Sequence, residues 1–426
     1  MSVRDGYSPT KAGEIPRGWQ FVRLADACEI VGGSTPSKIV ADYWNGDIPF
    51  ATPTDITGLN GRNILDGTKS RITKKGFESI SAKLLPPGSV LITSRATIGY
   101  CAINDSPVVT NQGFASLICK EGVHNLFMLY LMRSLKRKLE RLATGSTFRE
   151  VPRSSLRKLL ISLPSYNEQQ KIASVLLTVD EDIQKTDEII AETQQLKKGL
   201  MQQLLTKGIG HTKFKKTEIG EIPEEWEVTK LGDVLKDIRY GTSAKANSQR
   251  KGFPVLGIPN VIEGRIEDKD LRQVELSEPE TQATTIEEGD ILIVRTNANP
   301  DYIGRCALFE KRMGTWLYAS YLIRVRADSK RVLPAYLSRF LQSEIIRKAF
   351  LRIARTSAGN YNVNTRNIRS MVVCLPQLAE QQKIVSILSG IDEKMEKETD
   401  RKVKLENVKK GLMQVLLSGK VRVNVN

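Results

Sequence analysis

Few residues of this chain have the types and spacing that catalysis needs. The two histidines, His124 and His211, lie far apart without metal-ligand neighbours, so zinc chemistry has no support. Residues 32–38 (GGSTPSK) do not match the GxxxxGK[ST] loop that binds nucleotides. Residues 299–302 (NPDY) approach the Asn-Pro-Pro-aromatic loop that holds a flipped adenine, but the third residue is Asp and no glycine-rich turn for S-adenosylmethionine accompanies it. Residues 267–269 (EDK) end like a nuclease signature yet lack the preceding acid. Together these absences favour a protein that recognises a ligand over an enzyme.

The five cysteines also give no sign of chemistry. They form no CxxC pair, and their odd, scattered count suggests reduced thiols in a cytoplasm. Cys101 and Cys306 occupy matching contexts, IGYCAI and IGRCAL, and we interpret both as small buried strand residues.

Charge points to the class of partner. Lys and Arg number 64 against 48 Asp and Glu, which gives a net charge of +16 and a pI near 9.5. Nucleic acid is therefore the first partner to consider. No run of 18 apolar residues exists and the N-terminus has no signal-peptide core, so we expect a cytoplasmic protein without a membrane span.

One long stretch occurs twice and organises the chain. Residues 163–208 read LPSYNEQQKIASVLLTVDEDIQ…KKGLMQQLLTKG, and residues 375–420 read LPQLAEQQKIVSILSGIDEKME…KKGLMQVLLSGK. A constant offset of 212 residues superimposes them. Each copy follows a head of similar plan that opens GEIPxxW, at Gly13 and again at Gly220. A repeat of this length is a duplicated large unit rather than a solenoid repeat.

Both copies have the apolar periodicity of amphipathic helices, with a proline ahead and a glycine beyond. At about 40 residues each would extend roughly 60 Å. A helix of that length needs a partner for its apolar stripe. We favour an intramolecular antiparallel pair, although the pattern alone also permits dimerisation, and a spacer between two heads over a mere packing element. The predicted seam of the helix pair comprises Ile172, Leu176, Val179, Ile183, Ile384, Leu388, Ile391 and Met395.

The predicted organisation follows from the duplication. The fold class is α+β, with two pseudo-symmetric α/β domains joined by two long helices that form an antiparallel coiled coil. A helix is expected over residues 125–143 in the first head and over 336–354 in the second. The predicted segments are a flexible tail (1–12), a first head (13–163), a first long helix (164–207), a connector (208–219), a second head (220–375), a second long helix (376–418) and a tail (419–426).

These motifs together resemble the specificity (S) subunit of type I restriction–modification systems. The carrying strings are GEIPxxW, GGSTPS…DYWNGDIPF…TPTDI, PGSVLITSRATIG, TNQG, GSTFREV and the LP…EQQKI…D…KKGLMQxLL helix. The match covers nearly the whole chain, but the second head lacks the STPS, TPTDI and TNQG strings.

The resemblance implies a function without chemistry on this chain. Two target-recognition domains would each read one half of a bipartite, asymmetric site on double-stranded DNA, at opposite ends of the helix pair. The helices would set the unread spacer and dock two methyltransferase (M) subunits, which restriction (R) subunits would join. This chain would bind no cofactor, and S-adenosylmethionine, ATP and Mg²⁺ would belong to the partner subunits. A self-sufficient DNA methyltransferase or nuclease, and a coiled-coil scaffold without a DNA role, are the alternatives.

Candidate DNA contacts are polar, basic or aromatic residues in the loops of both heads, because Arg pairs with guanine, and Asn or Gln with adenine, by bidentate hydrogen bonds. Loop Thr, Asn and Asp residues also favour turns and caps without any ligand. The candidates in the first head are Thr35, Lys38, Thr52, Thr54, Asp55, Arg95, Thr97, Asn111 and Gln112. Those in the second head are Tyr240, Ser243, Lys245, Asn260, Arg295, Asn297, Tyr302, Arg305, Asn360, Tyr361 and Asn364.

Overall fold

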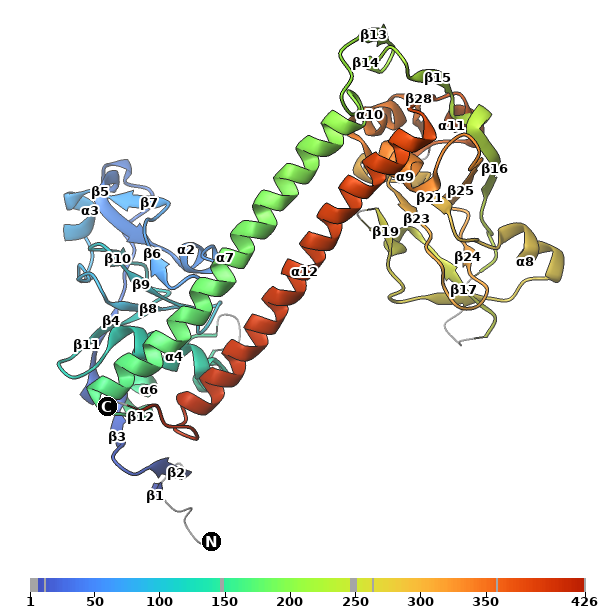
Figure 1. Cartoon of the computed structure of the whole chain (residues 1–426). Coiled ribbons are helices and arrows are strands. Elements are labelled where there is room, and N and C mark those ends of the chain that lie inside the picture. Colours follow the sequence, from blue (N-terminus) through green and yellow to red (C-terminus); the bar gives the residue numbers. More distant parts are fainter. Residues whose placement is uncertain are drawn as a thin grey trace. The chain divides into compact units, whose positions relative to one another are not determined.

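The structure is a computed structural model that describes residues 7–10, 13–145, 149–245, 251–262, 264–357 and 359–424. The chain divides into two compact units (Figure 1). Unit 1 is Met1–Ile189 with Glu398–Asn426, and unit 2 is Ile190–Lys397. Each unit therefore holds one head and parts of both long helices.

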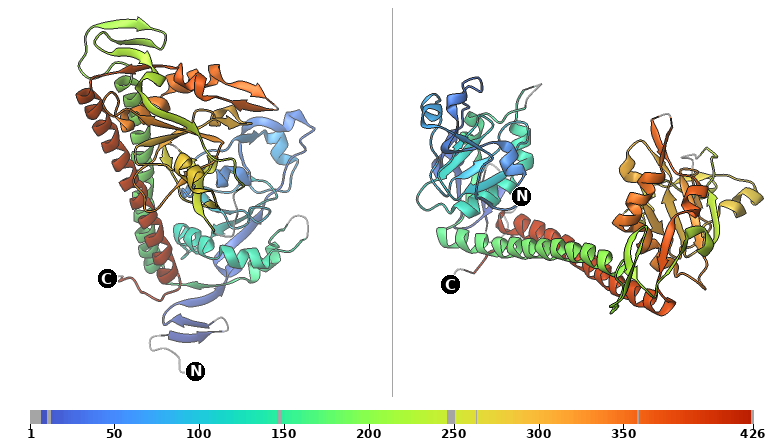
Figure 2. Two further views of the ribbon diagram at one scale, coloured as in Figure 1. Left: turned by 90° about the vertical axis from the view of Figure 1, so that its right-hand side faces the viewer. Right: turned by 90° about the horizontal axis from the view of Figure 1, so that it is seen from above.

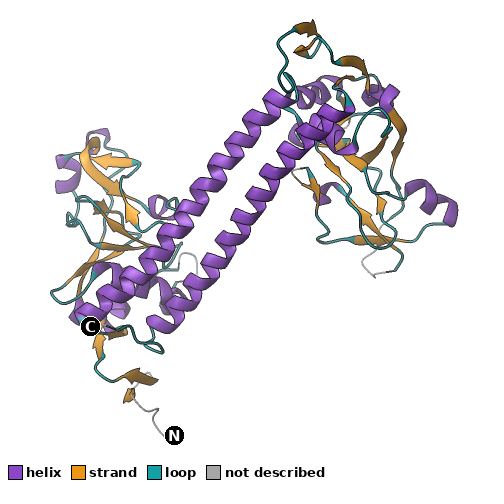
Figure 3. Ribbon diagram, viewed as in Figure 1, coloured by secondary structure: helices purple, strands orange, loops and turns teal. Residues whose placement is uncertain are grey.

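Both predicted long helices are present and unbroken (Figure 3). Helix α7 (Tyr166–Leu204) and helix α12 (Leu378–Leu416) contain 39 residues each. Pro164 and Pro376 lie just before them, where a proline disfavours an earlier start. Gly208 and Gly419 follow the two helices with positive φ angles of 65° and 71°, in the left-handed region that glycine adopts without strain.

Ion pairs show that α7 and α12 run antiparallel. In unit 1, Lys409 pairs with Asp180, and Lys402 Nζ lies 2.7 Å from Asp187 Oδ1. In unit 2, Lys197 Nζ lies 2.6 Å from Asp392 Oδ1. Moving forward along α7 corresponds to moving backward along α12 by the same number of residues. The predicted intramolecular antiparallel pair is confirmed.

The apolar stripes do more than form a seam between the two helices. Ile172 and Leu176 are fully buried in the hydrophobic core of the first head, together with Leu416 of α12. Ile384 and Leu388 are buried in the core of the second head in the same way. The remaining predicted seam residues, farther along each helix, are half-buried: Val179, Ile183, Ile391 and Met395. Part of the apolar stripe of each helix therefore packs against a head. The predicted seam, which assigned the whole stripe to the helix pair, did not include this contact.

The first head contains two main sheets. The larger has the strand order β4-β11-β8-β9-β6 and the smaller has the order β10-β5-β7, while β12 pairs with β3 beside α7. Strands: β3 (Gln20–Arg23), β4 (Cys28–Gly32), β5 (Trp44–Ala51), β6 (Ile64–Leu65), β7 (Ser70–Ile72), β8 (Val90–Ile92), β9 (Cys101–Asn104), β10 (Val109–Thr110), β11 (Ala115–Cys119), β12 (Leu160–Leu163). Helices: α1 (Leu24–Ala27), η1 (Ala41–Tyr43), α2 (Pro53–Thr57), α3 (Lys74–Glu78), α4 (Asn125–Ser134), α5 (Lys136–Leu142), α6 (Arg153–Lys158).

The second head repeats this plan (Figure 2, yellow to orange). The orders β16-β25-β21-β23 and β20-β17-β24 match β4-β11-β8-β9 and β7-β5-β10, and β15-β28 matches β3-β12. Strands: β15 (Glu227–Lys230), β16 (Leu235–Tyr240), β17 (Phe253–Leu256), β18 (Val261–Ile262), β19 (Arg265–Ile266), β20 (Arg272–Val274), β21 (Asp290–Val294), β22 (Thr296–Asn297), β23 (Cys306–Leu308), β24 (Leu317–Tyr318), β25 (Leu322–Ala327), β26 (Arg355–Ser357), β27 (Asn360–Asn362), β28 (Val372–Leu375). Helices: η2 (Leu231–Val234), η3 (Ile258–Asn260), α8 (Glu278–Thr284), η4 (Pro300–Tyr302), α9 (Pro334–Gln342), α10 (Glu344–Ile353), α11 (Thr365–Arg369).

Local predictions differ from the structure at three places. Residues 7–10, expected in a flexible tail, form strand β1 (Tyr7–Thr10) of a hairpin with β2 (Gly13–Pro16). The expected connector contains β13 (Phe214–Thr217), which pairs with β14 (Gly220–Pro223). Each expected head helix is two helices, because the backbone leaves the helical conformation at Leu135 and at Ser343.

A glutamate near the start of each long helix, buried in the case of Glu168 and half-buried in the case of Glu380, ties the head to the helix. Glu168 Oε2 accepts from Trp19 Nε1 at 3.1 Å, and its carboxylate also binds Arg422 Nε at 2.6 Å. In unit 2, Glu380 Oε2 accepts from Trp226 Nε1 at 3.2 Å, and Oε1 lies 2.9 Å from His211 Nε2. Both tryptophans are buried.

Candidate nucleic-acid interface

Four loops of the first head meet at one end of its sheets. The first loop (residues 32–38) follows β4, the second (110–114) follows β10, and the third (93–99) follows β8. Ser34 N donates to Thr110 O at 3.0 Å, and Ser94 N donates to Gly113 O at 2.7 Å. The fourth loop (144–150) joins because Ala96 N donates to Arg149 O at 3.2 Å. Its centre, residues 146–148 of the GSTFREV motif, lies outside the described residues.

Gly33 lets the first two loops approach. A Cβ on Gly33 would lie 2.0 Å from Asn111 O and 2.2 Å from Thr110 O, both backbone atoms that cannot rotate away. Only glycine fits at this crossing. The glycine therefore sets the distance between two loops that carry candidate DNA contacts.

The second head builds the same crossing from different residues. Thr242 N donates to Tyr318 O at 2.9 Å, and Arg295 N donates to Tyr321 O at 3.1 Å. A Cβ on Gly241 would lie 2.1 Å from Tyr318 O and 2.6 Å from Ala319 O. Residues 240–245 and 318–321 thus occupy the positions of the first and second loops. Sequence reasoning missed Gly33, Gly241 and the exposed Tyr321; aligning GGST with YGTS would have found the two glycines.

Polar side chains of the first head gather on this crossing. The Thr35 hydroxyl donates to Gln112 Oε1, and Asn111 Oδ1 accepts from Gly113 N at 2.9 Å. Asn111 N donates to Ala51 O at 3.1 Å, which places Thr52 beside the second loop. Since the Oε1 contact orients the exposed Gln112 amide, this residue has the chemistry for reading a base edge.

The two candidate arginines are not equivalent. Arg95 pairs with Glu150 across an isolated bridge and lies 4.0 Å from its carboxylate, next to Ala96, whose φ of 61° is unusual outside glycine. Arg295 instead donates to Ser320 O at 3.1 Å and lies over the Tyr240 ring at 4.9 Å. Arg295 therefore holds loops of the second head together, in addition to any contact with DNA.

Two predicted contacts have their polar atoms occupied within the protein. Asp55 is 7% exposed, and its Oδ2 accepts from Thr52 N at 2.7 Å and Thr52 Oγ1 at 2.6 Å, while Oδ1 accepts from Lys69 N at 3.1 Å. Asn260 is 6% exposed and likewise accepts from Gly257 N at 2.9 Å. These side chains cap α2 and η3 at matching places in the two heads, which is the structural role weighed above.

Replacing Asp55 with alanine is accordingly expected to weaken the fold rather than to remove a base contact. Three donors would lose their acceptor, so we expect a loss of about 1–3 kcal/mol in the free energy of unfolding. Urea unfolding of the full chain measures it. Thr54→Ala is the matched control, since Thr54 is an exposed neighbour in the same turn. An Asp55→Ala chain as stable as the Thr54→Ala chain would contradict this assignment.

The other candidates divide by exposure. Asn364 caps α11 by accepting from Asn367 N at 2.8 Å, and Asn297 Oδ1 accepts from Asn299 N at 2.9 Å. Tyr302 lies under the Arg305 guanidinium, and Tyr361 is half-buried in β27. Besides Thr54, Gln112, Tyr240 and Asn364, the exposed candidates include Lys38, Thr97, Ser243, Lys245 and Asn360. The last five of these side chains lie on the loops or the β26-β27 hairpin of their heads and are accessible to a ligand.

The described residues offer little for catalysis. They contain no group of three or more His, Cys, Asp or Glu side chains that could hold a metal ion. Burial raises the pKa of Cys101 and of Cys306 to about 12, so neither thiol is a nucleophile. Both lie buried in β9 and β23, as predicted. Among the residues that the structure describes, no helix is long and apolar enough to cross a membrane.

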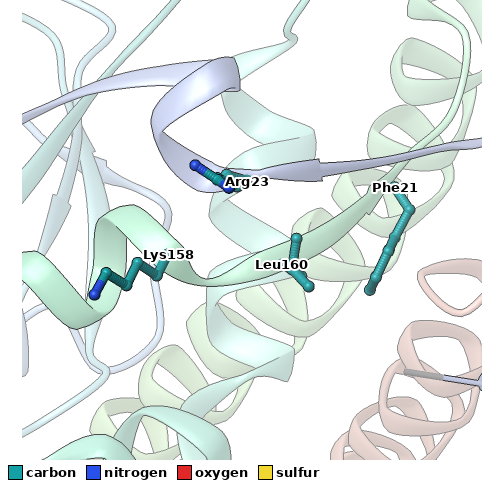
Figure 4. A pocket seen from close by; sticks show the side chains of 4 residues that line it. All are labelled: Phe21, Arg23, Lys158 and Leu160. Carbon is teal, nitrogen blue, oxygen red and sulfur yellow. The ribbon is translucent and has the colours of Figure 1, made fainter. Parts of the chain in front are cut away.

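A hollow of about 460 Å³ is lined by side chains from the paired strands β3 and β12 and from the end of α6 (Figure 4). Phe21, Leu160 and the exposed cations Arg23 and Lys158 line it. Its lining therefore consists of two cations and two apolar side chains. It is also formed by the strands that join the head to α7 rather than by the loop crossing.

Comparisons with known proteins agree with this architecture. The family model "Type I restriction modification DNA specificity domain" matches residues 16–195 and again 223–407. The MjaIX specificity subunit of Methanocaldococcus jannaschii is 29% identical over 98% of this chain and 96% of its own length. The EcoKI specificity subunit of Escherichia coli is 27% identical over 88% and 82%.

Solved structures show the same fold. The S subunit of a type I system from M. genitalium superimposes with a TM-score of 0.57 at 14% identity, covering 98% of both chains. A chain from a structure of a type I restriction–modification system reaches 0.62 at 20% identity, covering 97% of this chain and 100% of that chain. With two matched domains, two like-built heads and a shared helix pair, the chain belongs to the family of type I restriction–modification DNA specificity subunits.

Proposed function

We propose that each head reads one half of a bipartite, asymmetric site on double-stranded DNA, and that α7 and α12 set the length of the unread spacer. One observation carries this proposal: the same loop crossing is built twice around Gly33 and Gly241, yet the side chains on the two crossings differ. Two heads that share a scaffold but differ in their polar groups would bind DNA in the same way and recognise different sequences.

Charge and spacing support the same function. The net charge of +16 suits contact with phosphates, and Lys and Arg on the heads would release counterions on binding. Two 39-residue helices are each about 58 Å long at 1.5 Å per residue. Half-sites one helical turn apart are separated by about 34–36 Å, a distance that struts of this length can set.

The chemistry then belongs to partner subunits. The helix pair would dock two methyltransferase subunits, which restriction subunits join, and S-adenosylmethionine, ATP and Mg²⁺ would bind there. This proposal is supported by the relatives, which are named specificity subunits of type I restriction enzymes.

Mapping DNA methylation in cells tests the function. Co-expression with the methyltransferase encoded beside this chain should methylate adenines in a discontinuous motif of two unequal halves. Omitting this chain should abolish the methylation. Methylation at a continuous motif, or at none, would contradict the proposal.

A further inference from the structure

Two arginines of unit 2 converge on one backbone carbonyl. Arg305 follows η4, and its Nε donates to Asp301 O at 2.9 Å. Arg347, on α10, donates from Nη2 to the same oxygen at 2.6 Å and from Nη1 to Ile303 O at 2.7 Å. Two cationic side chains from separate elements are thus held side by side.

No carboxylate of the described residues pairs directly with either charge. Neither guanidinium lies within 4.0 Å of a carboxylate in this part of the chain, and the Asp301 carboxylate acts on Arg347 only from farther away. Arg326 of the same head, by contrast, pairs with Asp290 at 2.7 Å. Burial lowers the pKa of Arg347, and the positive charge of Arg305 lowers it further. Like charges that are partly withdrawn from water destabilise each other, so this arrangement favours a bound anion.

Arg305 is shaped for such an anion. Its guanidinium lies 3.8 Å from the Tyr302 ring centroid, and Nε is fixed by Asp301 O. Among the described residues nothing accepts a hydrogen bond from either Nη of this half-exposed side chain. A fork with two free donors and a restrained plane matches the two oxygens of a phosphate.

Arg305 of this pair lies close in the chain to Arg295, which contacts the loop crossing of the second head (residues 240–245 and 318–321). The chain passes from β22 directly into η4, and β22 pairs with β27 through Asn297 and Tyr361. We infer that Arg305 and Arg347 form a site for one phosphate of the DNA backbone at the half-site read by the second head. This inference rests on the proposed function and adds a contact that positions the DNA without reading a base.

Binding of duplexes by the complex of this chain with its methyltransferase tests the site. Arg305→Gln should lower the affinity roughly tenfold to hundredfold, because a charge-assisted hydrogen-bonded pair is lost. It should also reduce the slope of log K against log salt by about 1. Lys348→Gln is the matched control, since Lys348 lies on α10 beside Arg347 and already pairs with Glu344 at 2.8 Å. Its affinity should change far less.

Neutral methylphosphonates introduced one at a time locate the phosphate. A methylphosphonate at one position in the half-site of the second head should weaken the wild-type complex and should weaken the Arg305→Gln complex much less, because only the Arg347 charge remains there. Arg305→Lys should keep the salt slope but lose part of the affinity, because lysine lacks the fork. Arg347→Lys should likewise keep the salt slope and lose part of the affinity. Because this variant keeps the charge of the half-buried side chain, it distinguishes loss of the phosphate contact from a folding defect.

Four outcomes would overturn the site. Arg305→Gln could match Lys348→Gln in affinity and slope while the wild-type complex still prefers its bipartite duplex; then the site is wrong and the proposed function stands. The sensitive methylphosphonate could lie in the other half-site. Inorganic phosphate could bind the wild-type chain but not Arg305→Gln while DNA affinity stays unchanged, which would make a free anion the ligand. A wild-type complex without preference for any bipartite duplex would refute the function and the site together.

Discussion

Replacing Gly33 with alanine is expected to remove recognition of one half-site and to leave the other intact. The new Cβ would lie 2.0 Å from Asn111 O, which is 1.0 Å inside the 3.0 Å that real Cβ contacts respect, so the first and second loops must move apart. A displacement of about 1 Å at a recognition surface can cost roughly a hundredfold. We expect an affinity loss of that order for the bipartite duplex, measured by fluorescence anisotropy.

Matched variants make this prediction specific to the crossing. Gly241→Ala should have the complementary effect, because its Cβ would lie 2.1 Å from Tyr318 O. Duplexes scrambled in one half should show that each variant still discriminates only the half read by its intact head. Gly67→Ala adds a Cβ with nothing within 4 Å and should bind like the wild type. Equal loss at both halves from either variant would mean that the heads do not read separately.

Replacing Glu168 with glutamine is expected to loosen the first head from the helix pair. The Glu168 side chain is 2% exposed, and its carboxylate accepts from Trp19 and from Arg422. An amide group would turn an NH₂ toward one of these donors and would leave the arginine without a counterion. Removing one partner of a buried pair costs about 3–5 kcal/mol, and we expect about 2–3 kcal/mol here because Arg422 is 46% exposed and water can replace the bond.

Urea unfolding and hydrogen exchange together check this result. The expected increase in exchange lies in unit 1, in the segments around Trp19 and Arg422, while unit 2 keeps its own Glu380 anchor. Glu181→Gln is the control, as Glu181 is an exposed acid on the same helix. Exchange that rises equally in both units, or stability equal to that of Glu181→Gln, would show that this anchor is unimportant.

The domain organisation could be predicted from the sequence because the two copies of the duplicated unit can be aligned. The offset between the copies aligned Glu168 with Glu380, Asp180 with Asp392 and Lys197 with Lys409, and each pair makes the same kind of contact in its own unit. Burial of Cys101 and Cys306 was predicted from their matching contexts, IGYCAI and IGRCAL, in the two copies. Contacts repeated in two places constrain a prediction more strongly than any single motif.

The sequence does not separate the finer alternatives where one residue type serves two purposes. Asp55 and Asn260 have the chemistry of base contacts, but their hydrogen bonds close the first turn of α2 and η3. The stripe from Ile172 to Leu176 looked like a helix seam, although the partner that buries it is largely a head. Neither a cap nor a choice of packing partner changes the residue pattern, so only tertiary structure separates the alternatives.

The most direct test of the account shortens both long helices in register. Removing residues 187–193 and 396–402 deletes two turns from each helix and takes out the Asp187–Lys402 pair as a unit. Exchanging the charges of that pair, Asp187→Lys with Lys402→Asp, is the control that keeps the length. Methylation mapping should show the same two half-sites with a spacer shorter by about three base pairs, since seven residues rise about 10.5 Å and a base pair about 3.4 Å. Methylation of the original site with its spacer unchanged would contradict the claim that the helices fix the distance between the two heads.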